Sequence, residues 1–97
     1  MQNNKNTTYL LKLRRFEEKD INSECPYMLE EDNFSTHVNA FIDDIENLDG
    51  IVEVLYTRNS NVIDIEIQTA VTIDELREDI RAYLPRDICY FRYVSLV

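Results

Sequence analysis

The segment Val62–Thr69 alternates between apolar and polar residues. Its central apolar positions are Ile63, Ile65 and Ile67. A period of two predicts a β-strand whose apolar side chains all point to one face of a sheet. Such a strand belongs in a sheet that is covered on one face and open on the other. The rest of the chain must therefore supply partner strands and a cover for the apolar face.

Three further segments have strand character: Thr8–Glu17, Ile51–Tyr56 and Ile88–Val97. Residues 57–61 connect Ile51–Tyr56 to Val62–Thr69, which predicts an antiparallel hairpin. Pairing the two apolar faces sets Val54 opposite Ile65. The same register sets Glu53 opposite Glu66, and a shift by two residues would keep the same faces.

In the last strand the buried face is less evident from the pattern. We expect Cys89, Phe91 and Tyr93 to point inward, because this choice leaves Arg92 outside.

Two segments show the helical spacing of apolar residues. The first starts at a possible cap, Ser35 or Thr36, and ends before Gly50, which suits the left-handed residue after a helix. Its apolar stripe consists of Val38, Phe41, Ile42, Ile45 and Leu48. The second starts at the capping box Thr72–Glu75 and is stopped by Pro85. Its apolar stripe consists of Ile73, Leu76, Ile80, Tyr83 and Leu84.

The predicted order is strand, helix, strand, strand, helix, strand, so the chain is α+β. Over Thr8 to Val97 this pattern resembles the ferredoxin-like βαββαβ arrangement. The resemblance implies a four-stranded antiparallel sheet with the first and third strands central and both helices on one face. The length of 97 residues fits a single domain, 1–97. Within it, we expect residues 1–6 to be flexible and residues 18–34 to form a long acidic loop.

The formal net charge of −9 is unevenly distributed. Met1–Phe16 contains four basic residues and no acid, whereas Glu17–Asp49 contains eleven acids and one lysine. This distribution repels phosphate backbones and attracts basic surfaces, so we expect no direct nucleic-acid binding. RNA-recognition domains share the predicted topology, but their third strand carries a Lys/Arg-Gly-aromatic signature where this chain has carboxylates.

We expect no enzymatic activity and no cofactor, because no catalytic motif is present. ACT-type regulatory domains and acylphosphatase-like enzymes share the topology. The first usually show a glycine-bearing turn after the first strand, and the second need a basic loop there. This chain instead has Glu17–Asp20 at that place.

Glu53, Asp64 and Glu66 fall on the open face of the predicted sheet. Three carboxylates can hold a hard cation or form an acid/base pair with a raised pKa. The favoured interpretation is that Lys12 and Arg14 on the neighbouring strand neutralise them, and no metal site is predicted.

Cys25 and Cys89 are too few for a disulfide framework or a four-cysteine zinc site. We expect both thiols to be reduced, in a cytoplasmic protein. Cys25 and His37 can in principle form a thiolate–imidazole pair, but a buried thiol and an exposed histidine are the favoured interpretation. The polar run after Met1 and the lack of a long apolar stretch predict neither a signal peptide nor membrane association.

The leading hypothesis is a non-enzymatic module that binds a protein with a basic surface. Acidic side chains on a helix and a loop can copy the charge of a nucleic-acid backbone and occupy a basic channel. In size and charge the chain resembles small phage-encoded inhibitors of host defence, such as anti-CRISPR proteins and other DNA mimics. The proposed contacts are one apolar anchor and six acids: Tyr27, Glu30, Glu31, Asp32, Asp43, Asp44 and Glu46.

The alternative is a homodimeric regulatory or scaffold domain, in which the acids serve only solubility. Leu10, Phe16, Ile51 and Leu55 fall on the open sheet face, where they form either a dimer surface or a patch covered by the long loop. The last strand also offers an unprotected sheet edge to another chain.

Overall fold

The computed structural model describes residues 6–27, 31–84 and 89–97. The predictions for residues 1–5, Met28, Leu29, Glu30 and Pro85 lie outside this part of the chain. The described elements follow the predicted order. They are β1 (Thr7–Arg15), a short 3-10 helix η1 (Glu18–Asp20), α1 (Glu31–Glu46), β2 (Ile51–Asn59), β3 (Val62–Thr69), α2 (Ile73–Tyr83) and β4 (Phe91–Leu96).

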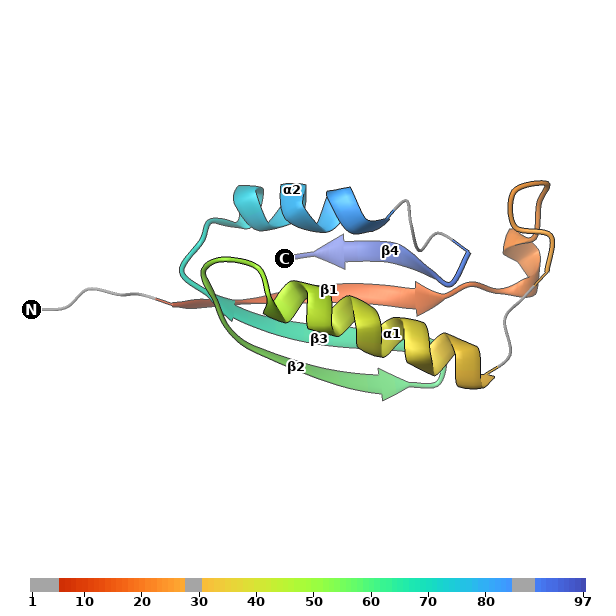
Figure 1. The fold of residues 1–97 in the computed structure, drawn as a ribbon, viewed down its shortest axis with the longest axis horizontal. Coiled ribbons are helices and arrows are strands. Elements are labelled where there is room, and N and C mark those ends of the chain that lie inside the picture. Colours follow the sequence, from red (N-terminus) through yellow and green to blue (C-terminus); the bar gives the residue numbers. More distant parts are fainter. Residues whose placement is uncertain (1–5, 28–30, 85–88) are drawn as a thin grey trace, which may run out of the picture.

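The four strands form one antiparallel sheet in the order β2-β3-β1-β4. The first and third strands are therefore central, as predicted, and β2 and β4 are the two edges. In Figure 1, α1 crosses the sheet diagonally and α2 runs beside β4. The α+β class and the antiparallel sheet are confirmed.

One hydrophobic core lies between the sheet and the two helices. The central strands contribute alternate residues, among them Leu11, Leu13 and the three isoleucines of β3, all fully buried. The helices contribute the predicted stripes, including Val38, Phe41, Ile42 and Ile45 from α1 and Leu76 and Ile80 from α2. Each buried aliphatic or aromatic side chain contributes about 1.5–3 kcal/mol relative to exposure. Because both helices enter the same core, both cover the same face of the sheet.

The start of α2 and the end of α1 each have a local cause. Thr72 accepts a hydrogen bond from the Glu75 backbone N–H, and the Glu75 side chain accepts one from the Thr72 backbone N–H, which confirms the predicted capping box. Gly50 has a φ of 86° after α1, as expected for a left-handed residue. The start of α1 was predicted too late, because the helix begins at Glu31 rather than after Ser35 or Thr36. The predicted loop 18–34 therefore contains η1 and the first turn of α1.

The predicted hairpin register is wrong by two residues. Val54 lies opposite Ile67, and Glu53 lies opposite Gln68. The cause is the turn: β2 continues to Asn59, so two residues rather than five connect the strands. The observed register avoids a direct Glu–Glu pair, which would be destabilising.

Two aromatic residues lie differently from the prediction. Phe16 was expected on the open sheet face, but only 2% of it is exposed, and the Arg92 guanidinium lies 5.4 Å from its ring centre. Phe91 is buried as predicted, whereas Tyr93 is 43% exposed. Tyr93 lies opposite the buried Leu13, but β4 is an edge strand with nothing beyond it in the described sheet, so its ring stays open to solvent.

The prediction that both cysteines are reduced is wrong. Cys25 and Cys89 form a disulfide that connects positions 64 residues apart, with a Cα–Cα distance of 5.4 Å, in the usual range. The topology brings them together, because β1 and β4 are neighbours and the backbone N–H of Phe16 donates to the carbonyl oxygen of Tyr90. Sequence spacing carries no signal for this pairing.

Candidate protein-binding surface

Three polar residues of α1 share one exposed face of the helix. Asn39, Asp43 and Glu46 follow at positions i, i+4 and i+7, and all three are exposed. Asn39 accepts a hydrogen bond of 2.9 Å from the hydroxyl of Tyr56 on β2. This contact fixes the orientation of the face, so Asp43 and Glu46 lie on the side of α1 that is turned toward β2.

β2 is an edge strand with an unusual number of exposed apolar side chains. Val52, Leu55 and Tyr56 are 58%, 55% and 45% exposed. Val54, between them, is buried in the core and anchors the strand. We call Asn39, Asp43 and Glu46 of α1 together with Val52 and Tyr56 of β2 the α1–β2 surface, whereas Leu55, opposite Glu66, points to the open face of the sheet. It combines carboxylates on a rigid helix with apolar side chains on a sheet edge.

The acids of the long loop are partly neutralised within the fold. Arg14 donates two hydrogen bonds to Asp20, of 2.6 and 2.9 Å, and the Asp20 side chain is only 10% exposed. The hydrogen bond from Arg14, followed by that from the Glu17 backbone N–H, holds the pKa of the Asp20 carboxyl far below its ordinary value. Lys19 lies 3.8 Å from Glu17. These carboxylates stabilise the loop and are not presented as a free acidic surface.

Tyr27 is 72% exposed, as an apolar anchor for a partner would be. It lines a shallow pocket of about 230 Å³ beside the disulfide, together with Glu24, Pro26 and Tyr90. Tyr90 also stacks on His37 of α1, so the pocket lies beside the middle of this helix. Asp43 and Glu46 follow His37 by six and nine residues, about 9 and 14 Å along the helix at the usual rise. Of these three predicted contacts, only Tyr27 lines the pocket.

The remaining predicted contacts differ in how they lie. Asp43 and Glu46 are exposed, and Asp44 is half-buried. Glu31 and Asp32 belong to the first turn of α1, but their side chains and all of Glu30 lie outside what the structure describes. Among the predicted acids with described side chains, the two that lie fully open are therefore on the α1–β2 surface.

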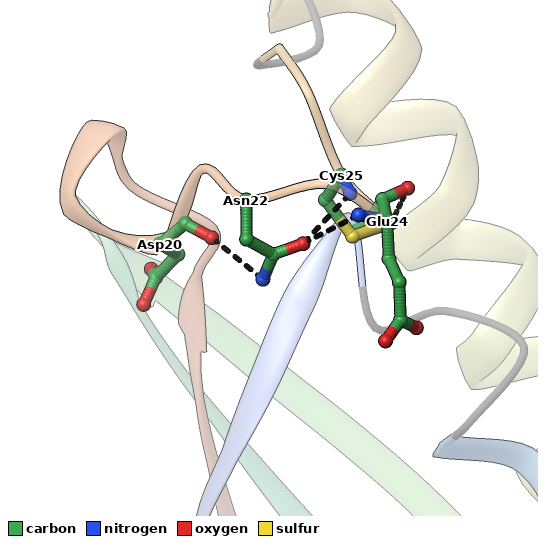
Figure 2. The surroundings of a disulfide bond; sticks show 5 residues. Asp20, Asn22, Glu24 and Cys25 are labelled. Carbon is green, nitrogen blue, oxygen red and sulfur yellow. Dashed lines mark hydrogen bonds between the residues drawn. A yellow bond between two sulfur atoms is a disulfide. The ribbon is translucent and has the colours of Figure 1, made fainter.

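The loop that carries Cys25 is built on one asparagine. The Asn22 side-chain oxygen accepts hydrogen bonds from the backbone N–H groups of Glu24 and Cys25, at 2.8 and 2.9 Å (Figure 2). The Asn22 side-chain amide donates to the carbonyl oxygen of Asp20. This turn directs Cys25 toward Cys89, and 2% of Cys25 is exposed.

The alternative catalytic and metal sites receive no support from the geometry. Cys25 is bonded to Cys89, so it offers no thiolate to His37, whose ring stacks on Tyr90 at 3.7 Å between centres. No group of three potential metal ligands occurs within residues 6–27, 31–84 and 89–97.

The predicted neutralisation of the open sheet face is confirmed in part. Lys12 lies opposite Asp64, with 3.9 Å between Nζ and Oδ1. Arg14 turns instead to Asp20. Glu66 has Leu10 on one side and Leu55 on the other, so the shifted register separates it from Glu53.

The exposed edge of β2 was the feature that the sequence interpretation missed. The signal was present, since Val52, Leu55 and Tyr56 do not all fit one face of a strand that has one covered side. From the sequence, only the last strand was expected to offer a free edge to another chain.

No protein-family model and no curated protein matches the chain. Neither α1 nor α2 has the length and apolar character that crossing a membrane would require.

Proposed function

We propose that the chain is a non-enzymatic module that binds a protein through a basic surface, with Asp43 and Glu46 as the central contacts. The observation that carries the proposal is the position of these two carboxylates. They project from a helix whose opposite side, including Phe41 and Ile45, is fully buried in the core. Within the part of the chain that the structure describes, no cation pairs with either of them. A rigid pair of open carboxylates is suited to a fixed basic partner.

The specific form that we propose is an inhibitor that imitates nucleic acid. The net charge of −9 on a chain of 97 residues gives a negative field, which attracts the basic groove of a nucleic-acid-binding protein. Small phage inhibitors of host defence, such as anti-CRISPR proteins, are the class of function that this charge and size suggest. The ferredoxin-like arrangement is part of the same proposal, supported by the strand order β2-β3-β1-β4 and the shared core of both helices.

The cytoplasmic location predicted from the sequence stays a prediction. The disulfide weighs against it, because disulfides persist mainly in oxidising compartments. Alkylation of the protein in intact source cells, followed by non-reducing electrophoresis, would show which state the cell maintains.

The test compares charge reversal at the proposed contacts with the same change elsewhere. The immobilised chain is incubated with an extract of its source cells, and bound protein is eluted with salt or with double-stranded DNA. We expect Asp43→Lys/Glu46→Lys to lose the salt-sensitive and DNA-sensitive bound protein. Glu78→Lys/Asp79→Lys, two exposed acids of α2, makes the same change in net charge and should retain it. If both variants retain the same amount of salt-sensitive and DNA-sensitive bound protein, the α1 acids are not the contacts.

The alternative is a homodimer. A dimer through the open sheet face loses one of its proposed residues, because Phe16 is buried. The exposed side chains of β2 instead favour a dimer in which the two chains pair through an edge strand.

A further inference from the structure

The outer edge of β2 has no partner strand in the described sheet. β2 pairs with β3 along one side only, and the sheet ends there. From Glu53 to Asn59 the pairing with β3 is regular, so the backbone groups of the other side form an ordered row. Seven residues of strand span about 23 Å, enough for a short extended segment to pair along it.

β2 has few of the features that usually protect a sheet edge. Edge strands are commonly kept free by prolines, charged side chains (lysine above all), bulges or short length. β2 carries two charged residues, Glu53 and Arg58. Ile51–Asn59 has nine residues, contains no proline and no lysine, and is bulged only at its first residues. The other edge, β4, has six residues, and its pairing is irregular in the middle, opposite Lys12 and Leu13. β2 is therefore the edge better suited to strand addition.

The side chains around β2 select the chemistry of a pairing segment. On the covered side, Tyr56 contacts Asn39 of α1, and the exposed acids Asp43 and Glu46 follow Asn39 on the same face of that helix. On the open side, Leu55 and Glu53 are both exposed. A strand laid along this edge would meet carboxylates and apolar groups on each of its two faces. Lysine or arginine combined with apolar residues is the complementary composition.

A second copy of the chain is a poor occupant of this edge. Two copies that each carry a formal charge of −9 would repel one another, and pairing through β2 would bring their two acidic α1 helices to the same interface. The charge therefore favours a basic segment of another protein over self-pairing.

We propose that the basic partner binds by adding an extended segment of basic and apolar residues to the outer edge of β2, as a fifth strand. The inference rests on the proposed function and specifies its mode. Main-chain hydrogen bonds to β2 supply part of the affinity, and Asp43, Glu46 and Glu53 select basic side chains.

The test uses two synthetic peptides of equal charge. The first alternates lysine and valine over seven residues. The second has the same sequence with N-methyl groups on two adjacent central residues, which removes hydrogen-bond donors on both edges of an extended peptide. We expect the first peptide to bind with about tenfold higher affinity, since the second loses one backbone hydrogen bond to β2 and carries an N-methyl group on the edge that would pair. Residue-resolved hydrogen exchange should show new protection in β2 and none in β4.

The outcomes separate this inference from the proposed function. If both peptides bind equally and Asp43→Lys/Glu46→Lys weakens both, strand addition is wrong while binding of a basic partner stands. If neither peptide binds, or protection appears in β4, the inference is also wrong. If sedimentation shows a dimer whose β2 amides are protected without peptide, a second copy occupies the edge and the inference is overturned.

Discussion

The guanidinium of Arg14 holds the carboxylate of Asp20 through two hydrogen bonds of 2.6 and 2.9 Å. Arg14 belongs to β1, and Asp20 ends η1, so this pair fastens the loop to the sheet. Asp20 also accepts a hydrogen bond of 2.8 Å from the backbone N–H of Glu17. Charged hydrogen bonds of this kind are stronger than neutral ones and favour the ionised carboxylate. The same pair raises the pKa of Arg14.

The pair makes stability depend on acidity in a defined window. Because the folded pKa of Asp20 lies below its ordinary value of 3.8, the unfolded chain binds the proton first on acidification. The stabilisation that the ionised Asp20 provides is complete well above pH 3.8, and it is lost as the pH falls toward the folded pKa. We expect Asp20→Asn to lower the free energy of unfolding at neutral pH by about 1–3 kcal/mol and to flatten its decline in this window. Urea unfolding at several pH values measures both.

Glu18→Gln is the matched control, since it removes one carboxylate from an exposed position of the same η1 helix. It should leave the neutral-pH stability nearly unchanged. An Asp20→Asn protein with the acid sensitivity of the wild type would show that the Arg14 contact does not carry the pH dependence.

The Cys25–Cys89 disulfide should be a major source of stability. It closes a loop of 64 residues, for which the chain-entropy relation gives about 4 kcal/mol. We expect reduction to lower the free energy of unfolding of the wild type by about this amount. Cys25→Ser/Cys89→Ser should resemble the reduced wild type and be insensitive to reductant. Equal melting temperatures for oxidised and reduced wild type would show that the bond contributes nothing to the folded state.

The fold was predictable to the extent that each element carries its own local signal. The alternation in β3 and the capping box at Thr72 needed no information from the rest of the chain. The hairpin register could not be predicted in this way, because it depends on where β2 ends. Residues 57–59 read as a loop by composition but continue the strand, and this shifts every pair by two.

The candidate site was harder to predict than the fold. Asp43 and Glu46 followed from helical spacing alone, and both are exposed. Tyr27 was grouped with them by charge and closeness in the sequence, but it lines the pocket beside the disulfide, which neither acid lines. The role of Asp20 depends on its contact with Arg14. The disulfide depends on β1 and β4 being neighbours in the sheet. Neither relationship leaves a trace in composition or periodicity.

The hairpin turn offers a stabilising substitution. Ser60 has a φ of 59°, which glycine adopts at no steric cost. We expect Ser60→Gly to raise the free energy of unfolding by up to about 1 kcal/mol, the left-handed strain less the extra entropy of glycine. Asn61→Gly, at the next position without a positive φ, should instead destabilise the chain. If thermal unfolding ranks the two variants in the opposite order, the turn geometry is wrong.

Gly50 joins α1 to β2 and so fixes the relative position of the two halves of the α1–β2 surface. Its φ is 86°, and a Cβ added there would lie 2.6 Å from Cγ1 of Val71. Gly50→Ala should therefore destabilise the chain by more than the about 1–2 kcal/mol of the left-handed backbone alone. Val71 is β-branched and has little freedom to rotate away.

A double-mutant cycle separates the two causes. Val71→Ala removes the methyl group that the new Cβ would meet, but leaves the backbone strain at position 50. We expect Gly50→Ala/Val71→Ala to be more stable than the sum of the two single changes predicts, while remaining less stable than Val71→Ala. Simple additivity in urea unfolding would mean that the clash with Val71 does not exist and that the backbone conformation carries the whole cost.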